Sequence, residues 1–218
     1  MTAAALPRYS LGEEIANAVT HGLGILLAIA GLAVLSAFAA LRGHAGHVIA
    51  AAVFGSALVA CYTTSTLYHA IPLPRVRQLL RALDHSAIFL LIAGTYTPFM
   101  LVSLGGALGW TMLAVIWSLA AAGIAARLAL KGRRHNLVVA CYVAMGWIVV
   151  LVARPLFASL PAGGLALLAA GGIAYTVGVI FYKWRSLPYS HAVWHGFVLA
   201  GSALHFFAVL FYVVPGAA

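Results

Sequence analysis

The sequence predicts an all-α integral membrane protein, folded as a bundle of seven transmembrane helices. Three observations lead to this prediction: 65% of the 218 residues are hydrophobic, only 7% are charged, and long apolar runs recur along the chain. Soluble domains are only about half apolar. A helical run of about 20 residues crosses a hydrocarbon core of about 30 Å. The composition therefore excludes an ordinary soluble domain.

Seven apolar runs define the predicted spans. They cover residues 19–41, 48–71, 84–104, 107–130, 137–153, 161–182 and 191–214. The fifth run is the shortest, because Arg154 and Pro155 are expected to end it early. The "GTYTPF" sequence predicts a kink at Pro98, where the threonine hydroxyls can satisfy freed backbone groups. No linker or repeat divides the chain, so we expect one domain over residues 1–218, with residues 1–18 as a cytoplasmic N-terminal segment.

The distribution of lysine and arginine predicts the orientation. If the chain crosses the membrane regularly, ten of its twelve basic residues fall on one side, and only Arg42 and Arg154 fall on the other. The ten are Arg8, Arg75, Arg77, Arg81, Arg127, Lys131, Arg133, Arg134, Lys183 and Arg185. Because cytoplasmic loops carry the excess of basic residues, we expect a cytoplasmic N-terminus and an extracytoplasmic C-terminus.

The net charge of +9 does not require a nucleic acid partner. A basic face beside the anionic lipids of the inner leaflet explains it equally well. We therefore expect membrane lipids as partners and no nucleic acid, and nothing in the sequence indicates a soluble partner.

Ionisable side chains, which are energetically unfavourable inside a membrane, collect at one end of the predicted bundle. Ionisable side chains inside membrane segments are rare and usually functional. His21 begins the first span, His69 ends the second, Asp84 begins the third, and His191 and His195 begin the seventh. All five therefore lie at the predicted cytoplasmic end. The topology is assigned from lysine and arginine alone, so this agreement is independent of the histidines.

The types and spacing of these residues indicate a zinc site. His191 and His195 are four residues apart, so they lie on one face of a helix. His69 supplies a third nitrogen, and three nitrogens with an open position for water are typical of catalytic zinc. Asp84 would then hold or deprotonate that water. Ser65, four residues before His69, could donate a hydrogen bond to the water or to a substrate carbonyl.

Structural roles remain open for the same residues. A pair of histidines four apart near a helix start is a weak signal, and His69 could simply bond to a neighbouring helix. Asp84 could cap a helix or pair with Arg81. The coincidence of these residues at one depth favours the metal site. His205 lies about 15 Å farther along the last span, so we expect it to form an interhelical hydrogen bond instead.

Four segments of the sequence resemble the hemolysin III family. This family is the bacterial branch of a larger family that also includes the adiponectin and progestin receptors. The four segments are "EEIANAVTHGLG", "STLYHA", "DHSAIFLLIAGTYTPF" and "PYSHAVWHGFVLAGSALHFFAV", and the resemblance covers nearly the whole chain. The motif residues are Ser65, His69, Asp84, Pro188, His191 and His195.

The resemblance implies seven helices in the bacterial inner membrane, with a cytoplasmic N-terminus. In the wider superfamily, which contains alkaline ceramidases, the three histidines hold zinc, and the aspartate and serine contact the zinc-bound water. The resemblance also implies a role connected with lipids, while the name of the family records a cytolytic activity.

The N-terminal motif of the family is present as Glu13, Asn17, Thr20 and His21. Glu13, Asn17 and His21 are spaced by four, so they would share one face if the first helix begins early, and they would then close the cytoplasmic mouth above the zinc. The alternative is a network of capping and salt bridges with Arg75 or Arg77.

Three functions compete at this point. The first is a zinc-dependent hydrolase of lipid amide or ester bonds, because a site at the inner edge of the hydrocarbon lies where lipid carbonyls lie. The second is a non-enzymatic regulator or sensor of membrane lipid composition, in which zinc is structural. The third is cytolysis, which we disfavour because nothing resembles a soluble precursor. A retinal protein is also disfavoured, because Lys131 and Lys183, the two lysines, fall at helix ends.

Overall fold

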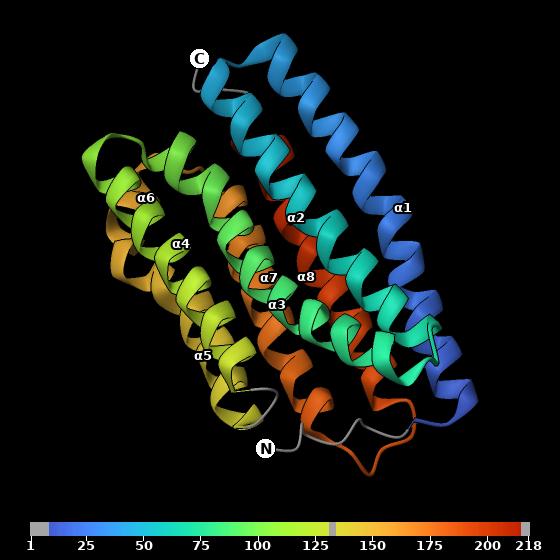
Figure 1. The fold of residues 1–218 in the computed structure, drawn as a ribbon. Coiled ribbons are helices and arrows are strands. Elements are labelled where there is room, and N and C mark those ends of the chain that lie inside the picture. The colour runs from blue at the N-terminus through green and yellow to red at the C-terminus, as the bar shows by residue number, and fades with distance from the viewer. Residues whose placement is uncertain (1–8, 131–133, 215–218) are drawn as a thin grey trace.

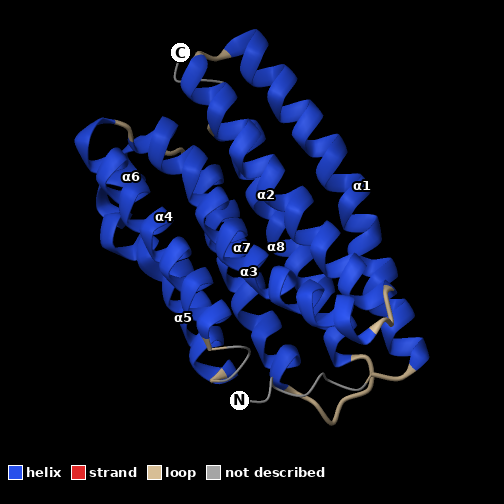
Figure 2. Cartoon of the chain, viewed as in Figure 1, coloured by secondary structure: helices blue, strands red, loops and turns tan. Residues whose placement is uncertain are grey.

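The computed structural model describes residues 9–130 and 134–214 of the chain. Within these ranges the regular structure is helical, with no strand (Figure 2). The α-helices are α1 (Leu11–Arg42), α2 (Ala45–Ala70), α3 (Pro74–Pro98), α4 (Gly106–Ala129), α5 (His135–Trp147), α6 (Ala153–Ser159), α7 (Ala162–Lys183) and α8 (Ser190–Tyr212). A π-helix, Phe99–Leu104, continues α3, and a 3-10 helix, Ile148–Val152, joins α5 to α6.

The seven predicted spans are confirmed. Five of them are the single helices α1, α2, α4, α7 and α8. The third span is α3 with its π-helix, Pro74–Leu104, and the fifth runs from α5 through α6, His135–Ser159. The start of α1 and the end of α8 lie at opposite ends of the bundle (Figure 1). Arg8, Lys131 and Arg133 of the predicted basic side lie outside the described residues.

Two helices begin earlier than hydropathy predicted. α1 begins at Leu11 instead of residue 19, because Ser10 caps it and the side chain of Glu13 accepts a hydrogen bond from the backbone N–H of Ser10. The described part of the predicted N-terminal segment is therefore mostly helical. α3 begins at Pro74 instead of Asp84, since proline suits a first helical position, where no N–H is needed. Hydropathy detects only the apolar turns of a helix, so it misses polar turns at an end.

The predicted end of the fifth span at residue 153 is wrong. α6 continues the span to Ser159. Pro155 lies in the first turn of α6, where a missing N–H is tolerated, so it does not stop the helix.

The third span is the most buried of the seven and forms the centre of the bundle. α2 and α4 pack against α3, while α8 packs against both α1 and α7. Gly94 allows α2 to approach closely, because a Cβ at this position would lie 2.6 Å from the Cβ of Ala57. A cavity inside the bundle is lined by residues of both α5 and α7, among them Tyr142 and Tyr175.

The helix changes type at the predicted kink. Pro98 has no N–H to donate, and the chain continues as a π-helix from Phe99. The hydroxyl of Thr95 donates to the carbonyl of Leu91 at 2.8 Å, and the hydroxyl of Thr97 donates to the carbonyl of Ala93 at 2.9 Å. The threonines therefore bond to carbonyls of the preceding turn, but not to that of Gly94, which is the one that Pro98 leaves without its i−4 partner.

The predicted orientation can be tested with reporters. We expect alkaline phosphatase fused after Ala218 to be active, because the C-terminus should be extracytoplasmic under the ten-to-two bias in basic residues. A fluorescent protein inserted within residues 131–135 should fold and fluoresce, because this segment should be cytoplasmic. Alkaline phosphatase activity within residues 131–135, together with fluorescence of a protein fused after Ala218, would reverse the assignment.

Candidate metal centre

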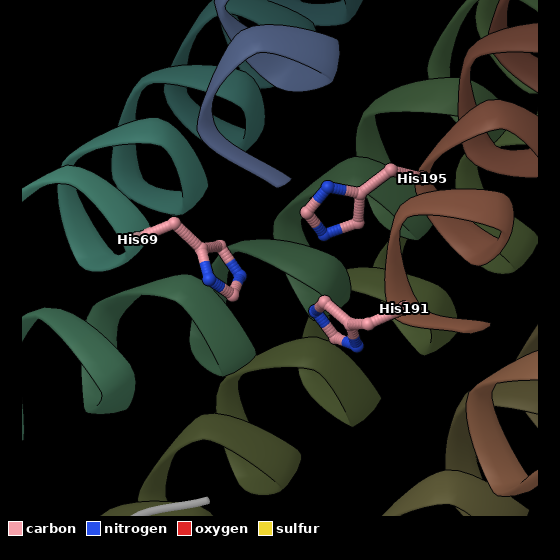
Figure 3. A group of neighbouring side chains, drawn as sticks. All are labelled: His69, His191 and His195. Carbon is pink, nitrogen blue, oxygen red and sulfur yellow. The ribbon is translucent and has the colours of Figure 1, made fainter. Parts of the chain in front are cut away.

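Three histidines from two helices converge at one end of the bundle (Figure 3). His69 lies in the last turn of α2, and His191 and His195 lie in the first turns of α8. One ligand nitrogen from each ring lies within 4.8 Å of the other two. The ring centroids are 5.0 Å apart for His69 and His191, 5.3 Å for His69 and His195, and 4.5 Å for His191 and His195. This end, where α1 begins and α2 ends, is called the histidine end below.

Hydrogen bonds at the outer nitrogens orient two of these rings. Nδ1 of His69 lies 2.7 Å from a carboxylate oxygen of Glu14, and Nδ1 of His195 lies 3.2 Å from the backbone carbonyl oxygen of Asn17. Because both partners are acceptors, we assign the ring proton to Nδ1, which leaves a lone pair on Nε2.

The inner nitrogen of His69 provides a test of whether the site fits a metal. Nε2 of His69 is buried and has no hydrogen-bond partner among the described residues. A buried lone pair beside two further imidazoles matches the donor set of zinc, which favours nitrogen ligands and four-fold coordination. The residues present therefore fit a metal ion held by three nitrogens.

Asp84 and Ser65 line the same cavity as His191 and His195. Both are buried, and Oγ of Ser65 has no partner among the described residues. Asp84 lies in the third turn of α3, so its alternative role as an N-cap is excluded. Asp84 and Ser65 thus share a cavity with two of the three histidines, and their predicted contact with a zinc-bound water stays a prediction.

His21 and Asn17 of α1 contact the histidines directly. The ring of His21 stacks on the ring of His195, with centroids 3.5 Å apart and an interplanar angle of 10°. Asn17 is fully buried; besides its backbone bond to His195, its side-chain nitrogen lies 3.4 Å from Nδ1 of His69. These residues form a layer around the histidines inside the bundle.

Glu13, the third predicted accessory residue, lies away from the histidines. Its carboxylate accepts hydrogen bonds from the backbone N–H of Ser10 at 2.8 Å and from that of Tyr189 at 3.1 Å. Glu13 therefore caps α1 and ties it to the start of α8. This matches the capping alternative and places Glu13 outside the candidate centre.

Glu14 is the acidic residue that contacts His69, and the sequence analysis missed it. One of its carboxylate oxygens contacts His69, and the other forms an ion pair with Arg77 of α3. The expected salt bridge to Arg77 is thus present, with Glu14 as the partner. Glu14, Asn17 and His21 are spaced by three and four, which is one face of a helix that begins at Leu11. That spacing could have identified Glu14 once the early helix start was known.

Tyr9 covers the histidines just before α1 begins. Its ring centroid lies 5.9 Å from that of His69 and 5.2 Å from that of His191. Burial, followed by the negative charge of Asp84, raises the pKa of Tyr9 to about 12. The phenol therefore stays protonated at neutral pH.

An apolar space leads away from the histidines into the bundle. The cavity lined by His191 and His195 has a volume of about 140 Å³. A second cavity of about 180 Å³ adjoins it and extends past the 3-10 segment to α6. The two share the lining residues Thr95, Tyr96, Gly146, Trp147, Gly172 and His205. Nε2 of His205 lies 3.0 Å from the carbonyl oxygen of Leu168, which confirms the predicted interhelical hydrogen bond.

Comparison with known proteins gives consistent matches over most of the chain. Residues 9–206 match the family model "Haemolysin-III related". The chain is 51% identical to "Hemolysin-3" of Bacillus cereus over 205 residues, which is 94% of each chain. It is 48% identical to "Hemolysin-3 homolog" of Bacillus subtilis (strain 168) over 206 residues, which is 94% of this chain and 97% of the relative. It is 30% identical to human "Monocyte to macrophage differentiation factor" over 207 residues, or 92% and 84% of the two chains.

Proposed function

This chain belongs to the haemolysin-III-related family, and we propose that it is a zinc-dependent hydrolase of lipid amide or ester bonds at the cytoplasmic leaflet. Seven apolar spans and its bacterial relatives make it a multi-pass protein of the bacterial plasma membrane. One observation carries the proposal: His191, His195, Asp84 and Ser65 all line one largely apolar cavity inside the bundle.

The shape of this cavity suits a lipid. Its remaining walls include Ile88, Leu91, Val179 and Val198, and the adjoining cavity continues the apolar space along α3. Binding sites for apolar ligands typically combine such walls with a few polar groups that fix the orientation. An acyl chain would lie along the apolar walls, and its amide or ester carbonyl would reach the histidine end.

The residues of the centre have complementary chemical roles. Zinc, when bound, polarises a carbonyl and lowers the pKa of a water molecule to about 7. His69, His191 and His195 would hold the ion. Asp84 is the general base that accepts a proton from the attacking water, and the hydroxyl of Ser65 donates a hydrogen bond to the substrate oxygen or to that water.

Residues around the centre would prepare it for this reaction. Glu14 and the backbone of Asn17 accept hydrogen bonds from the outer nitrogens of His69 and His195, so the inner nitrogens face the ion. Tyr9 packs over His69 and His191, which limits the access of water from the nearby end of the bundle.

A non-enzymatic regulator with a structural zinc is the second candidate function. The three histidines come from α2 and α8, so an ion bound to them would also join these two helices. A structural zinc needs the histidines but has no use for a general base. Asp84 therefore distinguishes the two functions.

Metal analysis tests the ion itself. We expect the purified chain to hold about one zinc ion, because three histidines and a water complete a tetrahedral shell. His191→Ala and His195→Ala should each lose most of the zinc, measured by mass spectrometry of the acid-digested protein. His44→Ala is the control, since His44 lies in the turn between α1 and α2 at the far end of the bundle. Full occupancy in the double variant would end the metal proposal.

Glu14 and its neighbour form a matched pair for a second test. Glu14→Gln should weaken zinc binding about 10- to 100-fold, because loss of a carboxylate behind a ligating histidine has effects of that size. Glu13→Gln changes the same charge one residue away and should bind zinc like the wild type, since Glu13 serves the cap. Competition with a fluorescent chelator measures both affinities. Equal losses in the two variants would mean that Glu14 has no specific role at His69.

Asp84→Asn separates catalysis from a structural ion. The variant should keep its zinc and its helical content, but lipid cleavage should fall about 10²- to 10⁴-fold, the usual cost of losing a general base. Mass spectrometry of bilayer lipids incubated with each purified protein measures this rate. His69→Ala should lose both zinc and cleavage.

Cells provide the outcome that would decide against hydrolysis. If Asp84→Asn alters the membrane lipids of a deletion strain as fully as the wild type does, the general base is unnecessary. The regulator would then be the function to pursue.

A further inference from the structure

His205 has one ring nitrogen without a hydrogen-bond partner among the described residues. The residue lies in α8, is 6% exposed, and lines both cavities. Nε2 bonds to the carbonyl oxygen of Leu168 at 3.0 Å, whereas Nδ1 is buried and unpartnered. Burial favours an uncharged ring, so we assign the proton to Nε2, which donates it, and a lone pair to Nδ1. The interhelical hydrogen bond therefore uses only one side of this imidazole.

The packing of α8 on α7 directs this lone pair away from α7. A Cβ on Gly171 would lie 2.3 Å from both Cδ2 and Nε2 of His205, so this edge of the ring rests on the backbone of α7. Nδ1 is the ring atom opposite that edge. Since the edge is covered, the ring meets the cavities with its remaining atoms, which include Nδ1. Other residues that line both cavities belong to α3 and α5: Thr95, Tyr96, Gly146 and Trp147.

Donor groups around the cavities are already used within the chain. The hydroxyls of Thr95 and Tyr96 donate to backbone carbonyls of α3 and α5, at 2.8 and 2.9 Å. The indole N–H of Trp147 donates to a threonine hydroxyl of α7 at 3.0 Å. The hydroxyls of Tyr175 and Ser202 bond to each other at 2.7 Å. A buried acceptor without a donor is unfavourable, so the donor for Nδ1 must come from a molecule bound in the cavities.

We propose that His205 accepts a hydrogen bond from a hydroxyl group on the acyl chain of the bound lipid, so that the substrates are lipid amides or esters of hydroxylated fatty acids. This inference rests on the proposed function, because it requires a lipid chain in the cavities. His205 lies ten residues after His195 in α8, so about 15 Å of helix separates them. A carbonyl group at the histidine end therefore places the middle of an acyl chain beside His205.

A buried acceptor discriminates between otherwise similar chains. An unsubstituted chain leaves Nδ1 unpaired, whereas a hydroxyl satisfies both Nδ1 and its own donor. Other walls of the second cavity are apolar, such as Phe99, Leu156 and Leu168, and they contact both kinds of chain. His205 is thus a residue that determines specificity, at a distance from the three histidines that would hold the ion.

Two fatty acids that differ by one hydroxyl test the site. Ricinoleic acid is oleic acid with a hydroxyl near the middle of its chain, and neither acid has an amide or ester bond to cleave. We expect the full-length chain in detergent to bind ricinoleic acid roughly three- to tenfold more tightly, the value of one neutral hydrogen bond. Native mass spectrometry measures both affinities. Equal affinities would overturn the inference and leave the lipid cavity standing, while no binding of either acid would contradict both.

A matched pair of variants locates the acceptor. His205→Gln keeps an amide N–H near the position of Nε2, which can still donate to Leu168, but it has no acceptor at the position of Nδ1. We expect this variant to bind both acids with the affinity that the wild type has for oleic acid. His205→Asn has an amide oxygen near the position of Nδ1, so it should retain a preference for ricinoleic acid. A full preference in His205→Gln would mean that the hydroxyl binds elsewhere, which would overturn the inference.

A third ligand gives a control that does not depend on the folding of any variant. Oxidation of the hydroxyl of ricinoleic acid gives a ketone, which is polar but has no proton to donate. Because Nδ1 is an acceptor, the wild type should bind the ketone no more tightly than oleic acid. Ketone binding as tight as that of ricinoleic acid would contradict an acceptor at His205. Zinc content and lipid cleavage, measured on the same proteins, report separately on the proposed hydrolysis.

Discussion

The carboxylate of Glu14 joins three helices at the point where the candidate metal centre is built. It extends from the first turn of α1 to His69 of α2 and Arg77 of α3, and so fixes the ends of these helices relative to one another. Ionisable groups within membrane helices usually pair with one another, as Glu14 does here. The same contact leaves the inner nitrogen of His69 free to face His191 and His195. The geometry of the centre therefore depends on an ion pair outside it.

The lipid environment explains why the polar groups gather in this way. Backbone groups in the hydrocarbon must be satisfied within each helix, and polar side chains must turn inward. α1 uses one face for Glu14, Asn17 and His21, while its other side carries exposed leucines such as Leu26 and Leu27. The inward polar face meets the histidines only at one end of the bundle. Beyond that end, the interior is the apolar cavity along α3.

The imbalance of charge has a different consequence at the histidine end. Twelve basic residues face three acidic ones, so most of the cations cannot find a partner within the chain. Exposed arginines can be neutralised by the surrounding lipid surface.

Some features of this protein follow from the sequence by itself. The number of spans and the family are determined by local patterns: apolar runs of membrane length and motifs of fixed spacing. The pairing of His191 with His195 is also local, because positions four apart on one helix must share a face. His69 and Asp84 could be assigned to the same end, since basic residues indicate the topology.

Only the tertiary structure decided which acidic residue serves the histidines. Glu13 and Glu14 are adjacent in sequence, and their roles depend on how far α1 is rotated against α2 and α8. The helix starts at Leu11 and Pro74 were missed because polar turns carry no hydropathy signal. The cavity and the burial of His205 arise from packing between helices distant in sequence. Local patterns predict what each helix presents, while the contacts between helices determine which of those groups meet.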